Sequence, residues 1–263
     1  MIVIAENLNT RNQAYMKAVT EFDPETIKRL SGELVNTGAD VINIQCSLDG
    51  SGDEEMLPRV VEVIVQSHDP VISLDTRNTE ALKRSVSLCT KPPIINYLSL
   101  EEQNAEKILS LCRNNQCWLI IRALKGIIPT SLEGKMQVLE ELIEMANAAD
   151  IPNVRLFADP SVVHIGRGMG QDHIASSHEC ILALKEMVDP PINTIAWISN
   201  VSVGLNKNLK STVDSTFMTY MAGAGLDAAI VDVLDTEIMK TIYLIRSFRD
   251  EIIFSEADLE GVG

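Results

Sequence analysis

Short runs of apolar, β-branched residues recur along the chain, and each is followed by a pattern typical of an amphipathic helix. The runs are apolar at nearly every position instead of alternating with polar residues. This is the pattern expected for parallel strands that are covered on both faces. Eight strands are predicted, over Ile2–Ala5, Val41–Ile44, Val71–Leu74, Pro93–Tyr97, Trp118–Ile121, Arg155–Ala158, Ile195–Ser199 and Ala228–Val231.

The segments between these strands carry apolar residues at helical spacing, which gives each predicted helix one buried face. Local signals agree, because Asp23 and Pro24 are typical of an N-cap and a first helical position, and Gly38 stands where a helix end favours glycine. The stripes are Ile27, Leu30 and Leu34; Met56, Val60, Val61 and Ile64; Ala105, Ile108, Leu109 and Cys112; Leu132, Met136, Leu139 and Ile143; and Ile238, Ile242 and Ile245.

Eight strand–helix units in 263 residues predict an α/β fold of the (β/α)8 barrel type, for which about 250 residues are typical. An open, doubly wound sheet is the alternative. It usually carries a G-x-G-x-x-G turn after its first strand, where this chain reads Glu6-Asn-Leu-Asn9. No linker, low-complexity tract or domain break interrupts the pattern, so we expect one domain over residues 1–263.

Composition narrows the class of protein. The chain is 46% hydrophobic and 22% charged, which is enough for a sizeable core and excludes a disordered chain. No run of about 18 apolar residues is present, which excludes a membrane span, and the N-terminus resembles a strand more than a signal peptide. The five cysteines include no C-x-x-C pair, so we expect buried thiols in a reducing cytoplasm.

The charge balance bears on possible ligands. With 37 acidic and 22 basic residues the net charge is −15, which argues against binding to nucleic acid. An anionic small ligand held by local dipoles remains possible, and the negative charge favours a basic docking partner.

Chemistry in a (β/α)8 barrel lies at the carboxyl ends of the strands. Nearly every predicted strand end here carries a carboxylate or a carboxamide, and none carries histidine. We therefore predict no bound metal, because transition metals favour imidazole or thiolate ligands. The polar positions are Glu6, Asn9, Asn43, Gln45, Asp75, Asn96, Arg122, Asp159, Asn200 and Asp232.

These side chains could bind the hydrogen-bonding edge of a flat heterocycle. A carboxylate accepts two parallel hydrogen bonds from an N–H/NH2 edge, and a carboxamide both donates and accepts. Two aspartates and one asparagine at neighbouring strand ends could thus hydrogen-bond the amide and amino groups of a pterin or a purine. A polar rim bridged by water is an equally open interpretation from spacing alone. The absence of G-x-S-x-G and P-loop motifs disfavours serine hydrolases and NTPases.

Ordered motifs stand at successive strand ends: Ile4-Ala-Glu6-Asn-Leu-Asn9, Leu74-Asp75-Thr-Arg-Asn78, Ile95-Asn96, Ala158-Asp159-Pro160, Gln171-Asp172-His173, Ile198-Ser199-Asn200-Val201-Ser202 and Gly225-Leu-Asp227-Ala-Ala-Ile-Val-Asp232. At these residues the sequence resembles the methyltetrahydrofolate:corrinoid-protein methyltransferases. That family belongs to the pterin-binding barrel superfamily, which includes dihydropteroate synthase. The resemblance extends over nearly the whole chain.

The resemblance implies a cytoplasmic homodimer that moves a methyl group between N5 of tetrahydrofolate and the cobalt of a corrinoid, such as cobalamin. A separate partner protein must carry the corrinoid, because the chain lacks D-x-H-x-x-G. By resemblance, Asp75, Asn96 and Asp159 hydrogen-bond the pterin ring, and Asn200 lies beside N5. An amide has no useful pKa, so Asn200 can stabilise protonated N5 but cannot supply the proton. Further pterin contacts are expected from Glu6, Asn9, Asn43, Gln45, Ser199 and Ser202.

The chain departs from the family at three positions. Asn43 and Gln45 stand where relatives commonly have Asp and Asn, and Trp197 stands where Gly is common. Two alternatives therefore stay open. One is an enzyme similar to dihydropteroate synthase, although the stretch Gly204–Ser211 lacks the expected arginine. The other is a non-catalytic module that binds folate or docks the corrinoid protein.

Overall fold

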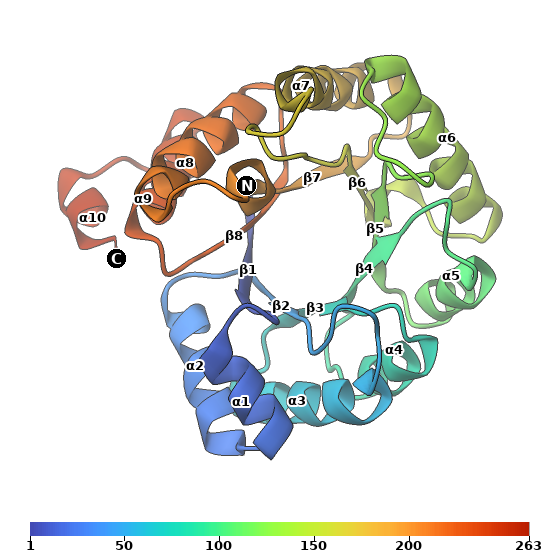
Figure 1. Ribbon diagram of the computed structural model, residues 1–263, viewed down its shortest axis with the longest axis vertical. Coiled ribbons are helices and arrows are strands. Elements are labelled where there is room, and N and C mark those ends of the chain that lie inside the picture. The colour runs from blue at the N-terminus through green and yellow to red at the C-terminus, as the bar shows by residue number, and fades with distance from the viewer. Residues whose placement is uncertain (263) are drawn as a thin grey trace.

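The protein is a closed barrel of eight parallel strands (Figure 1). The computed structural model describes residues 1–262, and each strand pairs with the next until β8 pairs with β1. This closed order confirms the predicted (β/α)8 fold and rules out the open sheet. The strands are β1 (Ile2–Leu8), β2 (Val41–Ile44), β3 (Val71–Asp75), β4 (Ile94–Leu98), β5 (Trp118–Arg122), β6 (Leu156–Asp159), β7 (Asn193–Trp197) and β8 (Ala228–Val231).

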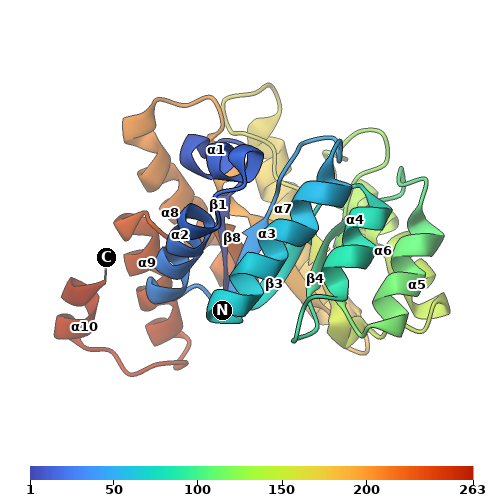
Figure 2. The same cartoon turned by 90° about the horizontal axis from the view of Figure 1, so that it is seen from below.

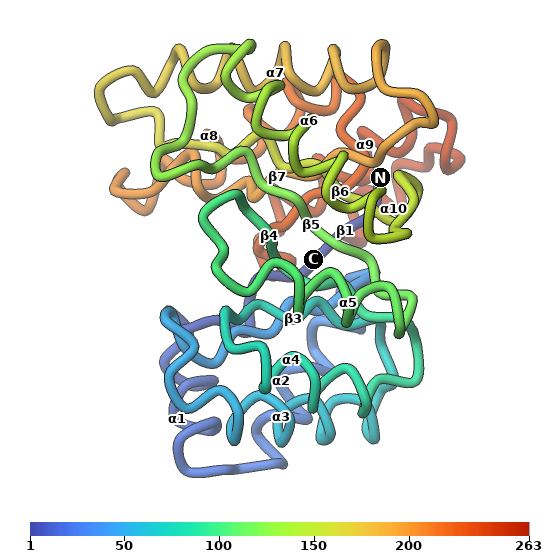
Figure 3. Tube along the Cα trace, turned by 90° about the vertical axis from the view of Figure 1, so that its right-hand side faces the viewer, coloured from blue at the N-terminus to red at the C-terminus, as the bar shows by residue number. Residues whose placement is uncertain are grey.

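Helices surround the barrel, and α10 lies outside the ring beside α9 (Figure 1). Figure 2 shows α1 at the opposite end of β1 from the N-terminus, near the carboxyl ends of the strands. Figure 3 shows the strands between α1 to α4 on one side and α6 to α9 on the other. The helices are α1 (Gln13–Glu21), α2 (Pro24–Asn36), α3 (Asp53–His68), α4 (Thr79–Val86), α5 (Ala105–Asn114), α6 (Leu132–Ala148), α7 (Gly170–Met187), α8 (Lys207–Gly223), α9 (Thr236–Phe248) and α10 (Glu256–Gly261), with short 3-10 helices η1 (Asn153–Arg155) and η2 (Ile198–Ser202).

The helix signals in the sequence are confirmed. The Asp23 side chain accepts a hydrogen bond from the Thr26 N–H at 3.2 Å, and Pro24 is the first residue of α2. Gly38 follows this helix with φ +93°, a left-handed conformation that glycine adopts without strain. Every residue of the five predicted apolar stripes is buried or half-buried. Amphipathic spacing therefore placed the packed face of each of these helices correctly.

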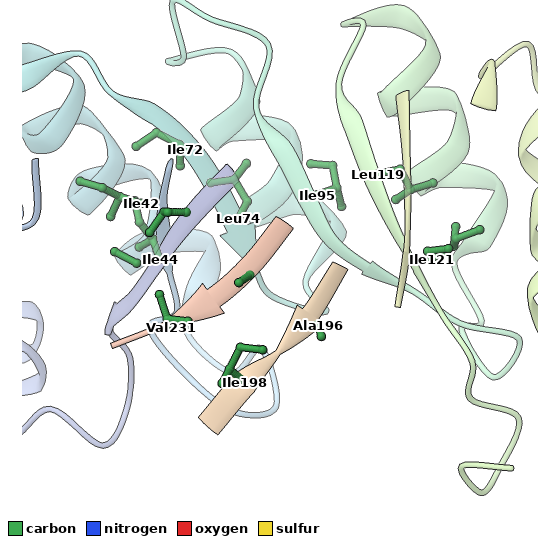
Figure 4. Close-up of a cluster of buried hydrophobic side chains, with 14 of the residues drawn as sticks. Ile42, Ile44, Ile72, Leu74, Ile95, Leu119, Ile121, Ala196, Ile198 and Val231 are labelled. Carbon is green, nitrogen blue, oxygen red and sulfur yellow. The ribbon is translucent and has the colours of Figure 1, made fainter. Parts of the chain in front are cut away.

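Alternate strand residues face opposite sides of the barrel wall. Those that face outward pack against the helices, as Figure 4 shows for Ile42, Leu74 and Ile121. A second cluster fills the barrel interior: Ile4, Val41, Ile94, Ile120, Phe157, Ile195, Ala228 and Ile230. Two residues closer to the carboxyl end of each strand, the next inward-facing side chain is polar or aromatic. The strand period therefore places the candidate chemistry at the carboxyl-end mouth of the barrel.

Three predicted strand ends are wrong. A strand over Ile195–Ser199 was expected, but β7 begins at Asn193 and ends at Trp197, where the chain turns into η2. The Ser202 hydroxyl donates to the carbonyl of Ser199 at 3.3 Å, which supports this tight turn. In turn, β1 continues to Leu8, so Glu6 lies within a strand instead of after it. The other six strands agree with the prediction to within one residue at each end.

Three further findings concern all the described residues. None of the helices within residues 1–262 combines the length and the apolar character needed to span a membrane. The five cysteines are free thiols, and all but Cys89 are buried. Over the same residues, no group of three or more His, Cys, Asp or Glu side chains is placed to hold a metal ion.

Candidate functional site

The mouth of the barrel contains two cavities. The first has a volume of about 190 Å³ and opens beside the ends of β2 to β5, with Trp197 of β7 on its other side. It is lined by Gln45, Asp75, Asn96, Arg122 and Trp197, together with Ser47, Leu48, Thr76, Arg77, Tyr97, Ser99, Glu101 and Glu102. The second has a volume of about 470 Å³ and lies beside β1, β8 and the start of α8. The predicted site residues are divided between the two.

Asp75 is the central carboxylate of the first cavity. Gln45 Nε2 donates to its Oδ2 at 2.9 Å, and Asn43 Nδ2 donates to the same oxygen at 3.4 Å. Burial raises the pKa of Asp75 to about 6, although Arg122 and the two amides act to lower it. Asp75 is therefore ionised at neutral pH. Its Oδ1 accepts no hydrogen bond within residues 1–262 and is free to accept from a ligand.

Asn96 presents an unused acceptor to the same cavity. Its Nδ2 donates to Asn43 Oδ1 at 3.1 Å, and Ser73 Oγ donates to that oxygen at 2.8 Å, so the orientation of both amides is fixed. Asn96 Oδ1 is buried and has no partner within residues 1–262. A buried, unpaired acceptor is destabilising by roughly 1–3 kcal/mol, a cost that a donor from a ligand or from water would offset.

Arg122 presents an unused donor beside it. Its Nε donates to Asp159 Oδ2 at 2.8 Å, and its guanidinium lies 3.8 Å from the centre of the Tyr97 ring. Arg122 Nη2 is buried and has no partner in the described part of the chain. Asp159 is not among the residues that line this cavity, so it contacts the site through Arg122. Sequence reasoning placed Arg122 at a strand end but missed it as a site residue.

Trp197 and Glu6 form the boundary between the cavities. The indole N–H of Trp197 donates to Glu6 Oε2, and Ser199 Oγ donates to the same oxygen at 2.8 Å. Burial raises the pKa of Glu6, and these two hydrogen bonds oppose the rise. Trp197 lines the first cavity, whereas Glu6 and Ser199 line the second. The indole of Trp197 thus contacts both the first cavity and the buried carboxylate of Glu6.

Four more residues of the predicted set line the second cavity, whereas Asn43, Asp159 and Asn200 line neither cavity. Glu6, Asn9, Ser199 and Ser202 line it, with the basic side chains of Arg11, Lys207 and Lys210 and the acidic ones of Asp214, Asp232 and Asp235. The structure therefore does not bring these four residues together with Asp75 and Asn96 in one pocket.

Three further polar residues lie in this region, of which Asn9 and Asn200 are predicted site residues. The Asn9 side chain holds its own turn, donating to the Glu6 carbonyl at 2.6 Å and accepting from the Arg11 N–H at 2.8 Å. Asn200 is half-buried in η2, between residues that line the second cavity, but lines neither cavity itself. Asp214 was missed: it is buried in α8, its Oδ1 has no partner within residues 1–262, and burial raises its pKa to about 6.

Comparison with solved structures shows the fold. Dihydropteroate synthase from Yersinia pestis, solved with a pterine–sulfa conjugate, superposes with a TM-score of 0.71 at 16% identity over 95% of this chain and 94% of that chain. The enzyme from Coxiella burnetii, in complex with pteroic acid, gives a TM-score of 0.71 at 14% identity over 95% and 94%.

Sequence comparison shows the family. The methylcorrinoid:tetrahydrofolate methyltransferase of Eubacterium limosum is 23% identical over 246 residues, which are 92% of this chain and 89% of that protein. The family described as pterin binding enzyme matches residues 6–232, from the Glu6 of β1 to the residue that follows β8. The match includes every residue that lines the first cavity, and the chain belongs to the pterin-binding enzyme family.

Proposed function

We propose that this protein transfers a methyl group between N5 of tetrahydrofolate and the cobalt of a corrinoid carried by a separate protein. The observation that carries the proposal is the first cavity, where one buried donor, Arg122 Nη2, and one buried acceptor, Asn96 Oδ1, have no partner within residues 1–262 and lie in the same lining as Asp75. The similarity to the Eubacterium limosum methyltransferase supports the choice of reaction. The resemblance of the motifs further supports a homodimer.

The polar groups of the first cavity complement a pterin ring. The N–H and amino groups of the ring donate to Asp75, and Asn96 Oδ1 accepts from a further ring N–H. Arg122 Nη2 donates to the ring carbonyl. In this arrangement Asp159 acts by holding Arg122, and Asn43 and Gln45 act by holding Asp75. Asn96 Oδ1 and Arg122 Nη2, which have no partner within residues 1–262, thus each receive one from the ligand.

The second cavity suits the remainder of the folate. Its basic side chains Arg11, Lys207 and Lys210 form no ion pair within residues 1–262, and they share the lining with the acidic Glu6, Asp214, Asp232 and Asp235. They offer counter-charges to the carboxylates of a p-aminobenzoylglutamate tail. Glu6, Asn9, Ser199 and Ser202 contact this part of the substrate in our proposal, instead of the ring.

Asn200 is the proposed catalytic residue. Departure of the methyl group from N5 would leave an amine anion, so the reaction requires positive charge on N5. The reduced cobalt of the partner protein supplies the nucleophile. Asn200 stabilises the protonated nitrogen by accepting its hydrogen bond, and water supplies the proton. The barrel mouth contributes orientation of the ring and exclusion of bulk water.

The test is a methyl-transfer assay without oxygen. The purified protein is mixed with methyltetrahydrofolate and chemically reduced cob(I)alamin, and the absorbance of cobalt(I) is followed. We expect the absorbance to decrease only when the protein is present. The rate of this decrease should be about 100-fold lower in Asn200→Ala. Asn114→Ala, on the exposed end of α5, is the matched control and should retain full activity. Unchanged turnover in Asn200→Ala would remove this residue from the mechanism.

A dihydropteroate synthase activity is the second candidate, and the shared fold favours it. Lys207, Lys210 and Ser211 line the second cavity, but no arginine accompanies them in the stretch Gly204–Ser211. Condensation of p-aminobenzoate with a pterin pyrophosphate distinguishes this reaction from methyl transfer. Binding of folate by calorimetry without either reaction would instead support a non-catalytic binding or docking module.

A further inference from the structure

Lys135 is buried in α6 in an unusual environment. Its exposed fraction is 0%, and its Nζ donates to the carbonyl oxygens of Pro160 at 2.7 Å and Ser161 at 3.1 Å. No carboxylate lies within ion-pair distance of it in residues 1–262. An ammonium group that is desolvated without a counter-charge destabilises a fold, so this lysine calls for a purpose other than stability.

Lys135 holds the turn that follows β6. Ser161 has φ +60°, a left-handed conformation that is strained for any residue with a Cβ. Besides Lys135, the Ser161 carbonyl accepts from Ser177 Oγ of α7 at 3.0 Å, and Ser161 Oγ donates to the Ala123 carbonyl at 3.2 Å. The strained turn is therefore fixed from three sides.

The fixed turn determines the orientation of Asp159. The Ser161 N–H donates to Asp159 Oδ1 at 2.8 Å, while Asp159 Oδ2 accepts from Arg122 Nε at 2.8 Å. Arg122 in turn lines the first cavity, where its Nη2 has no partner among residues 1–262. A continuous set of hydrogen bonds thus joins Lys135, at the back of the barrel wall, to the donor that faces the ligand.

We propose that Lys135 is a positioning residue for the first cavity: by holding the left-handed turn at Ser161 it aligns Asp159, and through it the Arg122 guanidinium, with the bound ring. Lys135 itself touches no ligand. The inference rests on the proposed binding of a pterin in this cavity, and it adds a residue from a helix that contributes nothing else to the mouth.

The surroundings of Lys135 make its charge state measurable. Burial lowers its pKa to about 8, although Cys180 and Asp159 act to raise it. Two other titratable groups face it from α7. Burial raises the pKa of Cys180 to about 12, and burial followed by Lys135 lowers the pKa of His173 below its ordinary range. Both stay neutral between pH 7 and 9.5, so in this window the change of charge at the turn belongs to Lys135.

The experiment measures the affinity of tetrahydrofolate by calorimetry without oxygen, from pH 7 to 9.5. Lys135→Met keeps the length of the side chain and removes its donors, and Lys107→Met, on the exposed face of α5, is the control. At pH 7 we expect Lys135→Met to bind about 10-fold more weakly than the wild type. At pH 9.5 the ratio should fall to about threefold, because a neutral amine donates more weakly. Titration of the ligand itself is common to all proteins and cancels in this ratio.

A second variant separates positioning from simple loss of packing. Ser161→Gly removes the strain of the left-handed turn together with the Oγ donor to Ala123, and Ser161→Ala, which loses the same donor but keeps the strain, is its matched control. Measured against that control, Lys135→Met combined with Ser161→Gly should recover most of the lost affinity and should fold if Lys135→Met alone does not. A ratio of one at every pH, or a loss without rescue, overturns the positioning role while leaving pterin binding intact. A wild-type protein that binds no tetrahydrofolate overturns the proposed function and this inference together.

Discussion

The indole N–H of Trp197 donates to the carboxylate of Glu6, and this bond joins β7 to β1 across the mouth of the barrel. Ser199 Oγ donates to the same oxygen at 2.8 Å, so the carboxylate of Glu6 is buried with two donors on one atom. Trp197 and Glu6 together form a wall that separates the first cavity from the second. On one side lie the polar ends of β2 to β5, and on the other lie the basic residues at the start of α8.

Removing the N–H from this wall should destabilise the protein. Trp197→Phe keeps an aromatic ring but leaves Glu6 with Ser199 alone, so we expect the free energy of unfolding at pH 8 to fall by about 1–2 kcal/mol. The hydrogen bond from Trp197 lowers the pKa of Glu6, so its contribution is largest above that pKa and is lost as Glu6 becomes protonated at lower pH. Urea unfolding at several pH values checks this. Trp118→Phe, at the other end of the barrel, should lack the same pH dependence.

Asp75→Asn should stabilise the protein and weaken its ligand. The pKa of Asp75 is about 6 in the folded protein against 3.8 ordinarily, so the folded state binds more protons and ionised Asp75 opposes folding above pH 6. The variant should gain on the order of 1–2 kcal/mol of unfolding free energy at pH 8, a gain that shrinks between pH 6 and 4. Denaturant titrations measure the gain. Equal stability of the two proteins at pH 8 would contradict the shifted pKa.

The same shift predicts how folate binding depends on pH. Only the ionised form of Asp75 accepts two hydrogen bonds from the ring, so affinity should weaken as the pH falls through about 6. Calorimetry at pH 5, 6 and 7.5 tests this, and the change should vanish in Asp75→Asn. An affinity that stays constant down to pH 5 would place the ring elsewhere.

Asn43→Asp should impair the site although it adds only a charge to a side chain of the same size. Asn43 Nδ2 donates to Asp75 Oδ2 at 3.4 Å, and a carboxylate there would repel Asp75. We expect the pKa of Asp75 to rise further and folate affinity at pH 7 to fall at least about tenfold. The pKa can be followed by NMR of the side-chain carboxyl group. Asn43→Ser, which removes the amide without adding charge, should reduce folate affinity less than Asn43→Asp does at high pH.

Asp159→Ala and Asn200→Ala should fail in different ways. Loss of Asp159 leaves the buried Arg122 guanidinium without its ion pair, so stability should fall by about 3 kcal/mol and folate affinity with it. Loss of Asn200 should reduce turnover with little change in affinity, because its contact forms only when N5 is protonated. Steady-state kinetics beside calorimetry distinguishes the two. Parallel losses in both variants would mean that Asn200 is a binding residue.

The fold could be predicted because its signals are local. The apolar runs and the helical stripes depend on residues within one element. Since successive strand residues face opposite sides of the sheet, Asp75 and Asn96 then fall on the inner face of the barrel. The end of β7 was missed because Ile198 continues the apolar run, although the chain there turns into η2. Apolar character alone does not separate a strand from a buried turn.

The division of the site could not be predicted, because it depends on side chains from distant elements. Nothing near Trp197 in the sequence indicates that its indole reaches Glu6, and Arg122 becomes a site residue only through Asp159 and Tyr97. Lys135 did carry a signal. It falls on the apolar stripe of α6, three residues after Leu132 and four before Leu139, and a charged residue at a buried position indicates a specific partner.

The hydrogen bond between Glu6 and Trp197 joins residues that lie 191 positions apart, and the pairing of β1 with β8 closes the barrel beside it. The strands β7 and β8 must therefore be in place before the mouth is divided into its two cavities. A ligand that requires this wall binds only the closed barrel, so by mass action it stabilises closure itself. In a newly synthesised chain, bound folate would therefore stabilise the state in which β8 has paired with β1 and the barrel is closed.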